Sequence, residues 1–289
     1  MRTESPKGSP MESKPQGKFT FECEDITPAL RDSSSAGRNQ VWKNWYDKLI
    51  SQLGNSEYRF FNYGYLGQEK IELDPAEQDK RNFIELYQRT LGDTDLTGKD
   101  VLDVSSGLGG GALWISRRHR PASLVAMDLS TEAVNLCNEW YSDQRNLRFV
   151  VGDSESLPFP DSSFDVIYNV ESAHCYGNFG AFLEEAQRVL RPDGVFCWSD
   201  FQSRSEMADI KSQFMDSGFT TVSFQDITEG VIRSLEFVRN GISEGTLDSN
   251  LFIWGGDTDS IQDVIEEFGD WRSYHCCQIS MDSSARSSR

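Results

Sequence analysis

The chain has 289 residues, and its 46 acidic side chains outnumber its 28 lysines and arginines, which gives a formal net charge of -18 at pH 7. Because that charge repels phosphate backbones and anionic lipid surfaces, we expect no nucleic-acid partner. Apolar residues make up 37% of the chain, enough for a large core. No apolar run reaches the roughly eighteen residues of a membrane span, and the N-terminus lacks the apolar stretch of a secretory signal. We therefore expect a cytoplasmic protein with no stable membrane insertion.

The six cysteines show no CxxC pairing, so we expect them to be small buried apolar residues and expect no metal site. Both ends of the chain are polar. Residues 1–38 are rich in Ser, Lys, Glu and Pro and follow neither a helical nor a strand period, and residues 282–289 share that character. Such segments bury too little surface to offset their ordering entropy, so we predict two disordered tails.

Residues 39–75 predict a helical and aromatic cap. Val41, Trp45, Leu49 and Leu53 recur at helical spacing before Gly54, and the aromatic stretch "YRFFNYGYLG" follows. The aromatic side chains are suited equally to a core and to a ligand contact.

Short apolar runs then alternate with amphipathic helices, which is typical of a parallel sheet covered on both faces. The expected strands are 100–104, 124–128, 147–153, 164–170 and 194–201, and helices are expected over 75–91, from Gly109, from Ser130 and over 178–191. This part of the chain predicts a doubly wound α/β domain.

The C-terminal part continues the domain to residue 281. It predicts a helix over 204–217, strands over 219–227 and 273–281, and helices over 227–243 and 258–268. We expect the two strands to form an antiparallel pair at one sheet edge. The insert, about 204–270, is a candidate lid.

The turn "DVSSGLGGGA", Asp103 to Ala112, follows the first strand and opens a helix. Its glycines allow a bound group to approach the backbone, and the helix N-terminus offers free N–H groups to an anion. Because the turn also satisfies the G-x-G-x-x-A pattern, it does not by itself separate NAD from other adenosyl cofactors.

Three acids at successive strand ends favour one of these cofactors. Asp103 would repel a pyrophosphate but attract a cationic ammonium, Asp128 can accept both ribose hydroxyls, and Asp153 can accept the adenine amino group. Each of the last two could instead only cap a helix or turn, since Ser130 and Ser154 follow them. In register, the three acids fit an adenosyl ligand with a methionine tail.

The segments "VLDVSSGLGGGA", "AMDLS", "GDSESLPFPDSSFDVIYNVESAHCY" and "VLRPDGVF" resemble, in order, the motifs of class I S-adenosylmethionine-dependent methyltransferases. The further segments "VWKNWY", "FFNYGYLG" and "NVESAHCY" are most similar to the phthiotriol and phenolphthiotriol dimycocerosate methyltransferases and related O-methyltransferases of polyketide and lipid products. The resemblance implies a Rossmann-like, mostly parallel seven-stranded sheet, S-adenosylmethionine as cofactor, and a hydrophobic hydroxylated small molecule as acceptor.

The resemblance also implies cofactor-binding residues. Ser105 stands where the broad superfamily usually has its first glycine. Around the methionine moiety we expect Asp103, Ser105, Gly107 and Gly109; around the ribose Asp128 and Leu129; around the adenine Asp153 and Ser154; and as further contacts Asn169, Trp45 and Tyr65, the last two closing over the cofactor from the cap.

His174 is one of only three histidines, and it follows the fourth strand at the sheet edge where doubly wound folds bind ligands. A lone histidine there is often structural, but this position favours a catalytic role. Asp200 ends the neighbouring strand on the same edge. An alcohol must lose its proton as it is methylated, so we predict His174 as the base and Asp200 as its orienting partner.

Other functions remain open at this point. Within the fold they are C- or N-methylation and a cofactor-dependent rearrangement without methyl transfer. Outside it they are a binding protein without catalysis and, disfavoured by Asp103, an NAD-dependent oxidoreductase. The sequence names neither the acceptor nor the oligomeric state.

Overall fold

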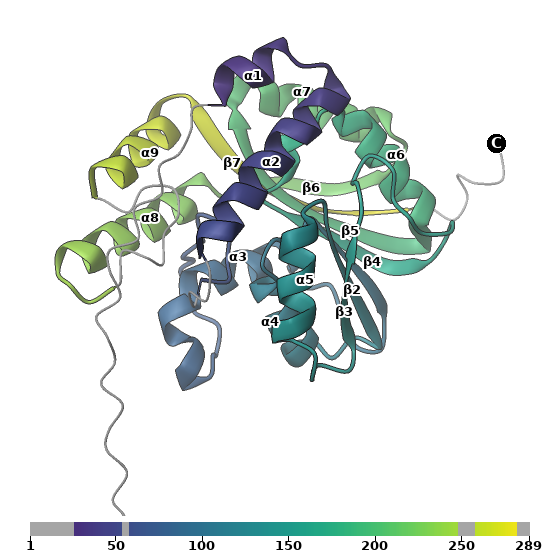
Figure 1. Cartoon of the computed structure of the whole chain (residues 1–289), viewed down its shortest axis with the longest axis horizontal. Helices are drawn as coiled ribbons and strands as arrows, with labels where there is room; N and C mark the ends of the chain where they lie inside the picture. The colour runs from purple at the N-terminus through teal and green to yellow at the C-terminus, as the bar shows by residue number, and fades with distance from the viewer. Residues whose placement is uncertain (1–25, 54–57, 248–257, 282–289) are drawn as a thin grey trace, which may run out of the picture.

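The computed structural model describes residues 26–53, 58–247 and 258–281. The predicted tails at 1–25 and 282–289, and residues 248–257 of the predicted insert, lie outside the described residues. A seven-stranded sheet in the order β3-β2-β1-β4-β5-β7-β6 forms the centre (Figure 1). Its strands are β1 (Asp100–Val104), β2 (Ser123–Asp128), β3 (Leu147–Val151), β4 (Phe164–Val170), β5 (Leu190–Ser203), β6 (Thr220–Asp226) and β7 (Arg272–Ser280). The Rossmann-like class I methyltransferase fold is confirmed.

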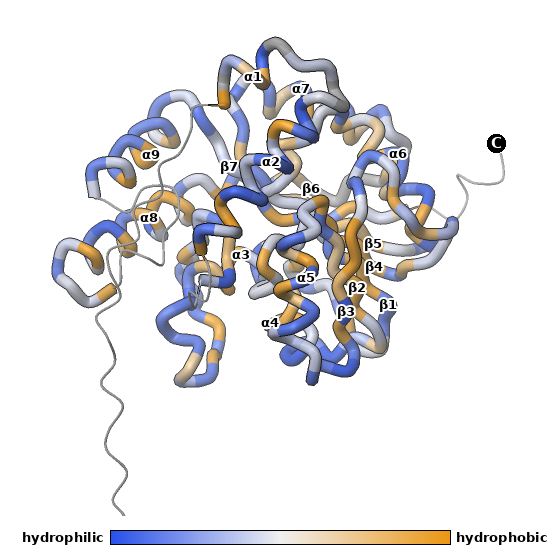
Figure 2. Tube along the Cα trace, in the orientation of Figure 1, coloured by the Kyte–Doolittle hydropathy of each residue, from blue (hydrophilic) through white to orange (hydrophobic). Residues whose placement is uncertain are grey.

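Helices cover both faces of the sheet, because the central strands are apolar on both sides and each side must be shielded from water. One core joins the sheet to α3 (Arg81–Leu91), α4 (Gly110–Arg118), α5 (Thr131–Trp140), α8 (Thr228–Ser243) and α9 (Thr258–Asp270). The other core joins it to α6 (Phe179–Val189) and α7 (Arg204–Asp216). Figure 2 shows the resulting contrast between apolar central strands and helices of mixed hydropathy.

Local signals set the helix starts close to the predicted positions. Ser130, Asn178 and Ser203 each accept a hydrogen bond from the backbone N–H three residues on, which satisfies one free donor of the first turn. A short 3₁₀ turn over Pro75–Lys80 precedes α3. β5 differs from the prediction: it begins at Leu190, directly after α6. Leu190 pairs with Phe164 and Val195 with Val166, so the intervening "RPDG" forms a bulge.

The C-terminal strands are antiparallel to their neighbours, as predicted, with β7 between β5 and β6. Part of the predicted insert belongs to the sheet layers and not to a lid, because α7 buries Met207, Ile210 and Phe214 in the second core and β6 pairs along β7. The rest of the predicted insert within the described residues is the pair α8 and α9, which pack on each other and on β7, and a lid role for them stays a prediction.

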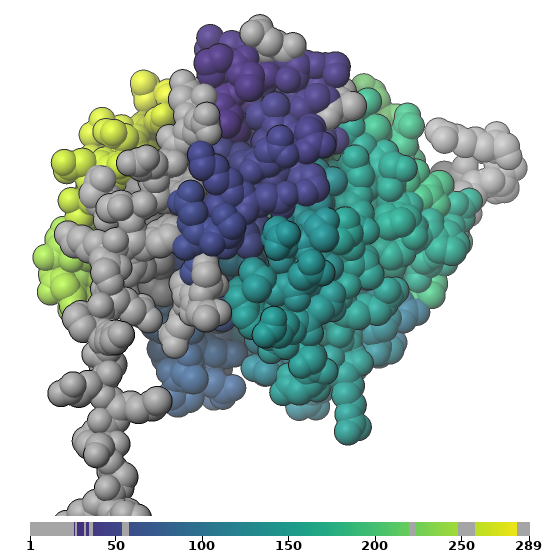
Figure 3. Space-filling view, viewed as in Figure 1, coloured from purple at the N-terminus to yellow at the C-terminus, as the bar shows by residue number. Residues whose placement is uncertain are grey.

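The N-terminal cap begins earlier than predicted. Residues 26–38 were expected in the disordered tail, but α1 (Thr27–Asp32) and α2 (Ser35–Leu53) include most of them. Local sequence patterns do not predict this helix start, because residues distant in the sequence hold the polar beginning of α2. Asn39 donates to Glu155 and accepts the Gly177 N–H. The space-filling view shows the purple segment of α1 and α2 at the top of the molecule, and α2 packs against α5 (Figure 3). Across the described residues, none of the helices is long and apolar enough to span a membrane.

Candidate functional site

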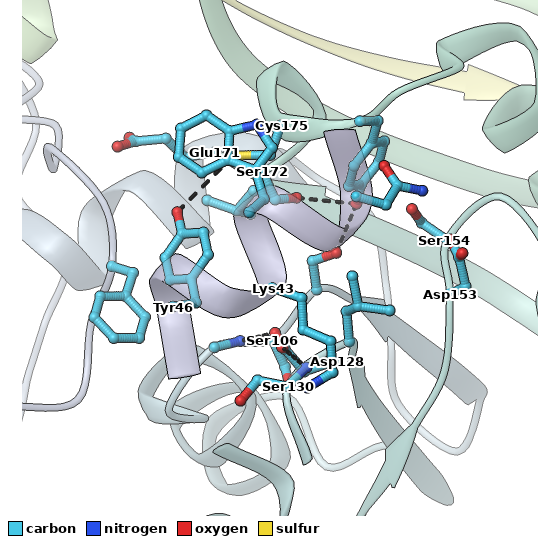
Figure 4. A pocket seen from close by; sticks show the side chains of 18 of the residues that line it. Lys43, Tyr46, Ser106, Asp128, Ser130, Asp153, Ser154, Glu171, Ser172 and Cys175 are labelled. Atoms are coloured by element: carbon cyan, nitrogen blue, oxygen red, sulfur yellow. Dashed lines mark hydrogen bonds between the residues drawn. The ribbon is translucent and has the colours of Figure 1, made fainter. Parts of the chain in front are cut away.

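A cavity open to solvent lies at the carboxyl ends of β1, β2 and β4, beneath α2. Side chains of the strand-end loops and of α2 line it together (Figure 4). The lining residues are Asn39, Trp42, Lys43, Tyr46, Ile50, Phe61, Tyr87, Ser105, Ser106, Gly107, Asp128, Leu129, Ser130, Asp153, Ser154, Val170, Glu171, Ser172, Cys175 and Tyr176.

The glycine turn shapes the floor of the cavity. Gly107 has φ +56°, and a Cβ there would lie 2.7 Å from the Phe61 ring, so both backbone conformation and space require glycine. Ser105 also lines the cavity and is left-handed, with φ +64°, although it is not glycine. Its Oγ lies 2.7 Å from the Tyr176 hydroxyl. Gly109, φ +73°, faces Phe149 and Tyr141 instead and does not line the cavity.

Asp128 ends β2 at the cavity wall. Its Oδ2 accepts the Gly107 N–H at 2.8 Å and its Oδ1 the Ser130 N–H at 2.9 Å. Burial raises the pKa of Asp128 to about 6, and these N–H groups oppose the shift. Leu129 lies beside it on the wall. The arrangement presents a fixed carboxylate of the kind that accepts hydrogen bonds from a ribose.

Asp153 and Ser154 line the far side of the cavity (Figure 4). Asp153 Oδ1 accepts the Glu155 N–H at 2.9 Å, which fixes the turn after β3. Glu155 in turn accepts the Asn39 side chain and the Gly177 and Asn178 N–H groups. This carboxylate joins three separate segments at the rim.

Asp103 and Asn169 lie beneath the floor, and neither lines the cavity. Asn169 donates to the Val104 carbonyl and to the Ser172 and Tyr176 hydroxyls, so it ties β1 to the loop after β4. Burial raises the pKa of Asp103 well above its ordinary value. Their cofactor roles stay predictions.

The two aromatic residues predicted to close over the cofactor lie elsewhere. Trp45 is buried in the cluster that contains Leu108 and Ala133. Tyr65 packs against α8, where a Cβ on Gly230 would lie only 2.0 Å from its ring. The apolar and aromatic α2 residues that line the cavity are Trp42, Tyr46 and Ile50, a second stripe at the same four-residue spacing as the buried one. That second stripe was the sequence signal for the side of α2 that faces the cavity.

His174 and Asp200 meet as predicted. The ring Nδ1 lies 2.8 Å from Asp200 Oδ1, and the His174 backbone N–H donates to Asp200 Oδ2 at 3.0 Å. The ring contacts Trp42 edge-on, with centroids 6.2 Å apart, and lies tilted against Phe201, with centroids 4.4 Å apart. Burial lowers the pKa of His174, but Cys175 and the fully buried Asp200 raise it to well above the ordinary value, which favours the protonated ring. His174 lies beside the cavity and is not one of its lining residues.

Glu171 is a cavity residue to which the sequence analysis assigned no cofactor or catalytic role. It directly follows β4 with φ +50°, a strained conformation for a residue with a Cβ. Its carboxyl accepts the Tyr63 N–H at 3.0 and 2.9 Å and the Tyr274 hydroxyl at 3.0 Å. Burial raises the pKa of Glu171 to about 8 against the Tyr63 N–H and the charge of His174, which lower it.

One unused hydrogen-bonding group on the cavity lining fits the predicted adenosyl cofactor. Ser106 Oγ is buried and has no hydrogen-bond partner among the described residues. Buried polar groups of native proteins are almost always paired, so this hydroxyl is available to a ligand in the cavity.

Comparisons with known proteins agree with this geometry. Residues 102–198 match the model of a methyltransferase domain family. The chain is 39% identical over 199 residues to the probable phthiotriol/phenolphthiotriol dimycocerosates methyltransferase 2 of Mycobacterium ulcerans, covering 68% of this chain and 77% of that protein. It is 36% identical over 199 residues to the fatty-acid O-methyltransferase of Mycolicibacterium smegmatis, covering 68% and 72%.

Among solved structures, the fold is similar to that of geranyl diphosphate C-methyltransferase from Streptomyces coelicolor A3(2), in complex with Mg²⁺, geranyl diphosphate and S-adenosyl-L-homocysteine. The TM-score is 0.60 at 16% identity, and the match covers 81% of this chain and 97% of that one.

Proposed function

The chain belongs to the S-adenosylmethionine-dependent methyltransferases, in the branch that includes the phthiotriol/phenolphthiotriol dimycocerosates methyltransferases, and from this premise we propose that it methylates a hydroxyl of a hydrophobic small molecule. One observation carries the proposal. A single cavity combines the strand-end acids Asp128 and Asp153 with an aromatic and aliphatic wall from α2 and Phe61. A lipid-like or polyketide-like acceptor suits such a wall.

For cofactor binding we propose the predicted residues that line the cavity. Asp128 and Leu129 would hold the ribose, Asp153 and Ser154 the adenine, and Ser105 with Gly107 the methionine end. Bound there, S-adenosylmethionine supplies an electrophilic methyl group. The chain's own task is then to orient the acceptor behind that methyl and to exclude water.

For catalysis we retain the predicted pair His174 and Asp200. The pair is formed and its ring touches Trp42, a cavity residue. Because the raised pKa favours the protonated ring, the pair is better suited to stabilise negative charge near the acceptor than to take the first proton. His174→Ala and Asp200→Ala should each slow methyl transfer. Full turnover in both, with cofactor affinity unchanged, would remove the pair from the mechanism.

The reaction class is tested by incubating the protein with S-adenosylmethionine and 4-dodecylphenol, a hydrophobic hydroxyl probe. We expect S-adenosylhomocysteine and the methyl ether, both measured by mass spectrometry. Asp128→Asn should weaken cofactor binding by calorimetry about tenfold or more, because it removes a charged acceptor. Asp165→Asn, at the opposite edge of the sheet, is the control. Methyl transfer to carbon or nitrogen probes only would favour the alternative reactions.

A further inference from the structure

We propose that the Glu171 carboxylate accepts the proton of the acceptor hydroxyl and that its charge disfavours acceptors that present a carboxylate. This assignment rests on the proposed function and gives the site its missing base.

The position of Glu171 favours contact with the acceptor over contact with the cofactor. Among the labelled cavity residues in Figure 4, Asp153 and Ser154 lie on one side, and Glu171, Cys175 and Tyr46 lie on the other. With the adenine at Asp153 and the ribose at Asp128, the transferable methyl is directed toward the Glu171 side. A base must lie within hydrogen-bond reach of the proton it takes, and Glu171 is the carboxylate on this part of the wall.

The carboxyl group is held in place yet keeps capacity to accept a proton. The Tyr63 N–H is shared between both oxygens, and the Tyr274 hydroxyl donates to Oε2. Oε1 therefore has only the shared N–H among the described residues. A carboxylate offers about four acceptor positions, so Oε1 retains room for an acceptor hydroxyl. The left-handed backbone at Glu171 points to the same conclusion, because such strain persists at functional sites.

The surroundings tune the basicity of Glu171. Burial raises its pKa to about 8, so it is a stronger base than an ordinary carboxylate and titrates near working pH. The titratable groups that interact with Glu171 come from six parts of the chain: His174 in the 3₁₀ turn η2 (Ala173–Cys175), Asp200 on β5, Tyr63 in the loop after α2, Tyr274 on β7, Tyr46 on α2 and Tyr87 on α3. Among these, protonated His174 favours the ionised form and Asp200 opposes it.

The step balances with the groups present. The acceptor oxygen forms a bond to the methyl carbon while the bond between that carbon and sulfur breaks, and its electron pair stays on sulfur. The hydroxyl proton moves to Glu171 Oε1 and later leaves to solvent. The products are a methyl ether, neutral S-adenosylhomocysteine and a protonated Glu171.

The negative charge of Glu171 also makes the site favour hydroxyl acceptors over carboxylate acceptors. A hydroxyl donates to ionised Glu171, whereas a second carboxylate beside it is repelled in a low-dielectric cavity. A fatty acid is already ionised and needs no base, so the two acceptor types respond to Glu171 in opposite directions.

The test compares Glu171→Gln, which keeps the shape and removes the charge, with Glu85→Gln. Glu85 is equally buried, 4% exposed against 5%, but lies on α3, where it pairs with Arg81 outside the cavity. The probes are 4-dodecylphenol and dodecanoic acid, which share a chain length. The readouts are ether and ester formation at pH 8.5 and, separately, calorimetric binding of each probe with S-adenosylhomocysteine present.

For Glu171→Gln we expect ether formation to fall about 10²- to 10⁴-fold, the usual contribution of a general base. Ester formation should hold or rise, and dodecanoate should bind more tightly. Glu85→Gln should leave ether formation, ester formation and dodecanoate binding at their wild-type values. Ether formation and dodecanoate affinity that both match the wild type would overturn the proposal, as would an equal loss of ether and ester, which indicates a purely structural role.

The wild-type pH profile is a second measurement that needs no variant. Ether formation should rise toward a plateau above about pH 8, and ester formation should not rise with it; a flat ether profile contradicts the assignment. If Glu171→Gln keeps wild-type ether formation and wild-type dodecanoate affinity, only this inference is wrong. If neither probe leads to release of S-adenosylhomocysteine, the proposed function is wrong, and dodecanoate binding still tests the assignment of Glu171.

Discussion

At the scale of single residues, two cavity residues have a left-handed backbone conformation that normally belongs to glycine. Ser105 and Glu171 both have positive φ, and each ends a neighbouring strand, β1 and β4. Such a conformation costs about 1 kcal/mol or more without compensation. At Ser105 the compensation is the hydrogen bond to Tyr176, which also binds Asn169 and Ser172.

The compensation at Ser105 is testable. Ser105→Ala keeps the strain and loses the hydrogen bond, whereas Ser105→Gly loses the bond but relieves the strain. We therefore expect the Gly variant to be more stable than the Ala variant by about 1 kcal/mol in urea unfolding. Equal stabilities, or a more stable Ala variant, would show that the backbone at this position carries no strain.

At the scale of elements, α2 is fastened across the cavity by polar contacts at its N-terminal end. Asn39 donates to Glu155 at 3.0 Å and accepts the Gly177 N–H at 3.0 Å, so one side chain joins the cap to the loops after β3 and β4. The apolar stripe of Trp45, Leu49 and Leu53 anchors the rest of the helix. A bound cofactor between Asp128 and Asp153 would lie beneath this helix.

Removing the fastening should speed the exit of the cofactor product. Asn39→Ala deletes two hydrogen bonds, one of them to a carboxylate, worth together about 2 kcal/mol. We expect S-adenosylhomocysteine to dissociate about tenfold faster or more in a stopped-flow displacement experiment. Gln40→Ala is the matched control, since that neighbour is exposed and, within the described parts of the chain, its side chain bonds Asn44 of the same helix alone. Unchanged dissociation in Asn39→Ala would mean that α2 does not retain the ligand.

At the scale of the whole molecule, the buried acids couple stability to pH. The pKa values of Glu171 and Asp128 are raised to about 8 and about 6, so the folded state binds protons that the unfolded chain has released. Stability should therefore fall as pH rises from about 4.5 to 8. The net charge of -18 adds self-repulsion in the same direction.

A comparison of variants isolates the contribution of Glu171. The free energy of unfolding, measured in urea at pH 5 and pH 8, should drop less in Glu171→Gln than in the wild type. The difference is about 1.4 kcal/mol for each unit by which folding raises this pKa. A parallel drop in both proteins would show that Glu171 titrates normally.

The sequence predicted the sheet because every strand carries its own apolar run and every loop its own turn or capping residue. It placed Gly107, Asp128 and Asp153 around one cavity for a related reason: all three lie at or just after strand ends that parallel pairing brings to one edge. It did not predict which face of α2 meets the cavity, because Trp42 and Trp45 belong to adjacent stripes of similar character. Nor did it predict the importance of Glu171, whose partners lie far away along the chain.

The three-way attachment of Glu171 also has a consequence for how the molecule is made. Its partners Tyr63 and Tyr274 lie 108 residues before it and 103 residues after it. During synthesis from the N-terminus, the cap helix leaves the ribosome before any strand that it covers, and β7, which carries Tyr274, emerges last and must insert between β5 and β6. The acceptor end of the cavity therefore takes shape only when nearly the whole chain is available, so a chain that stops short of β7 would hold the cofactor floor without a finished active site.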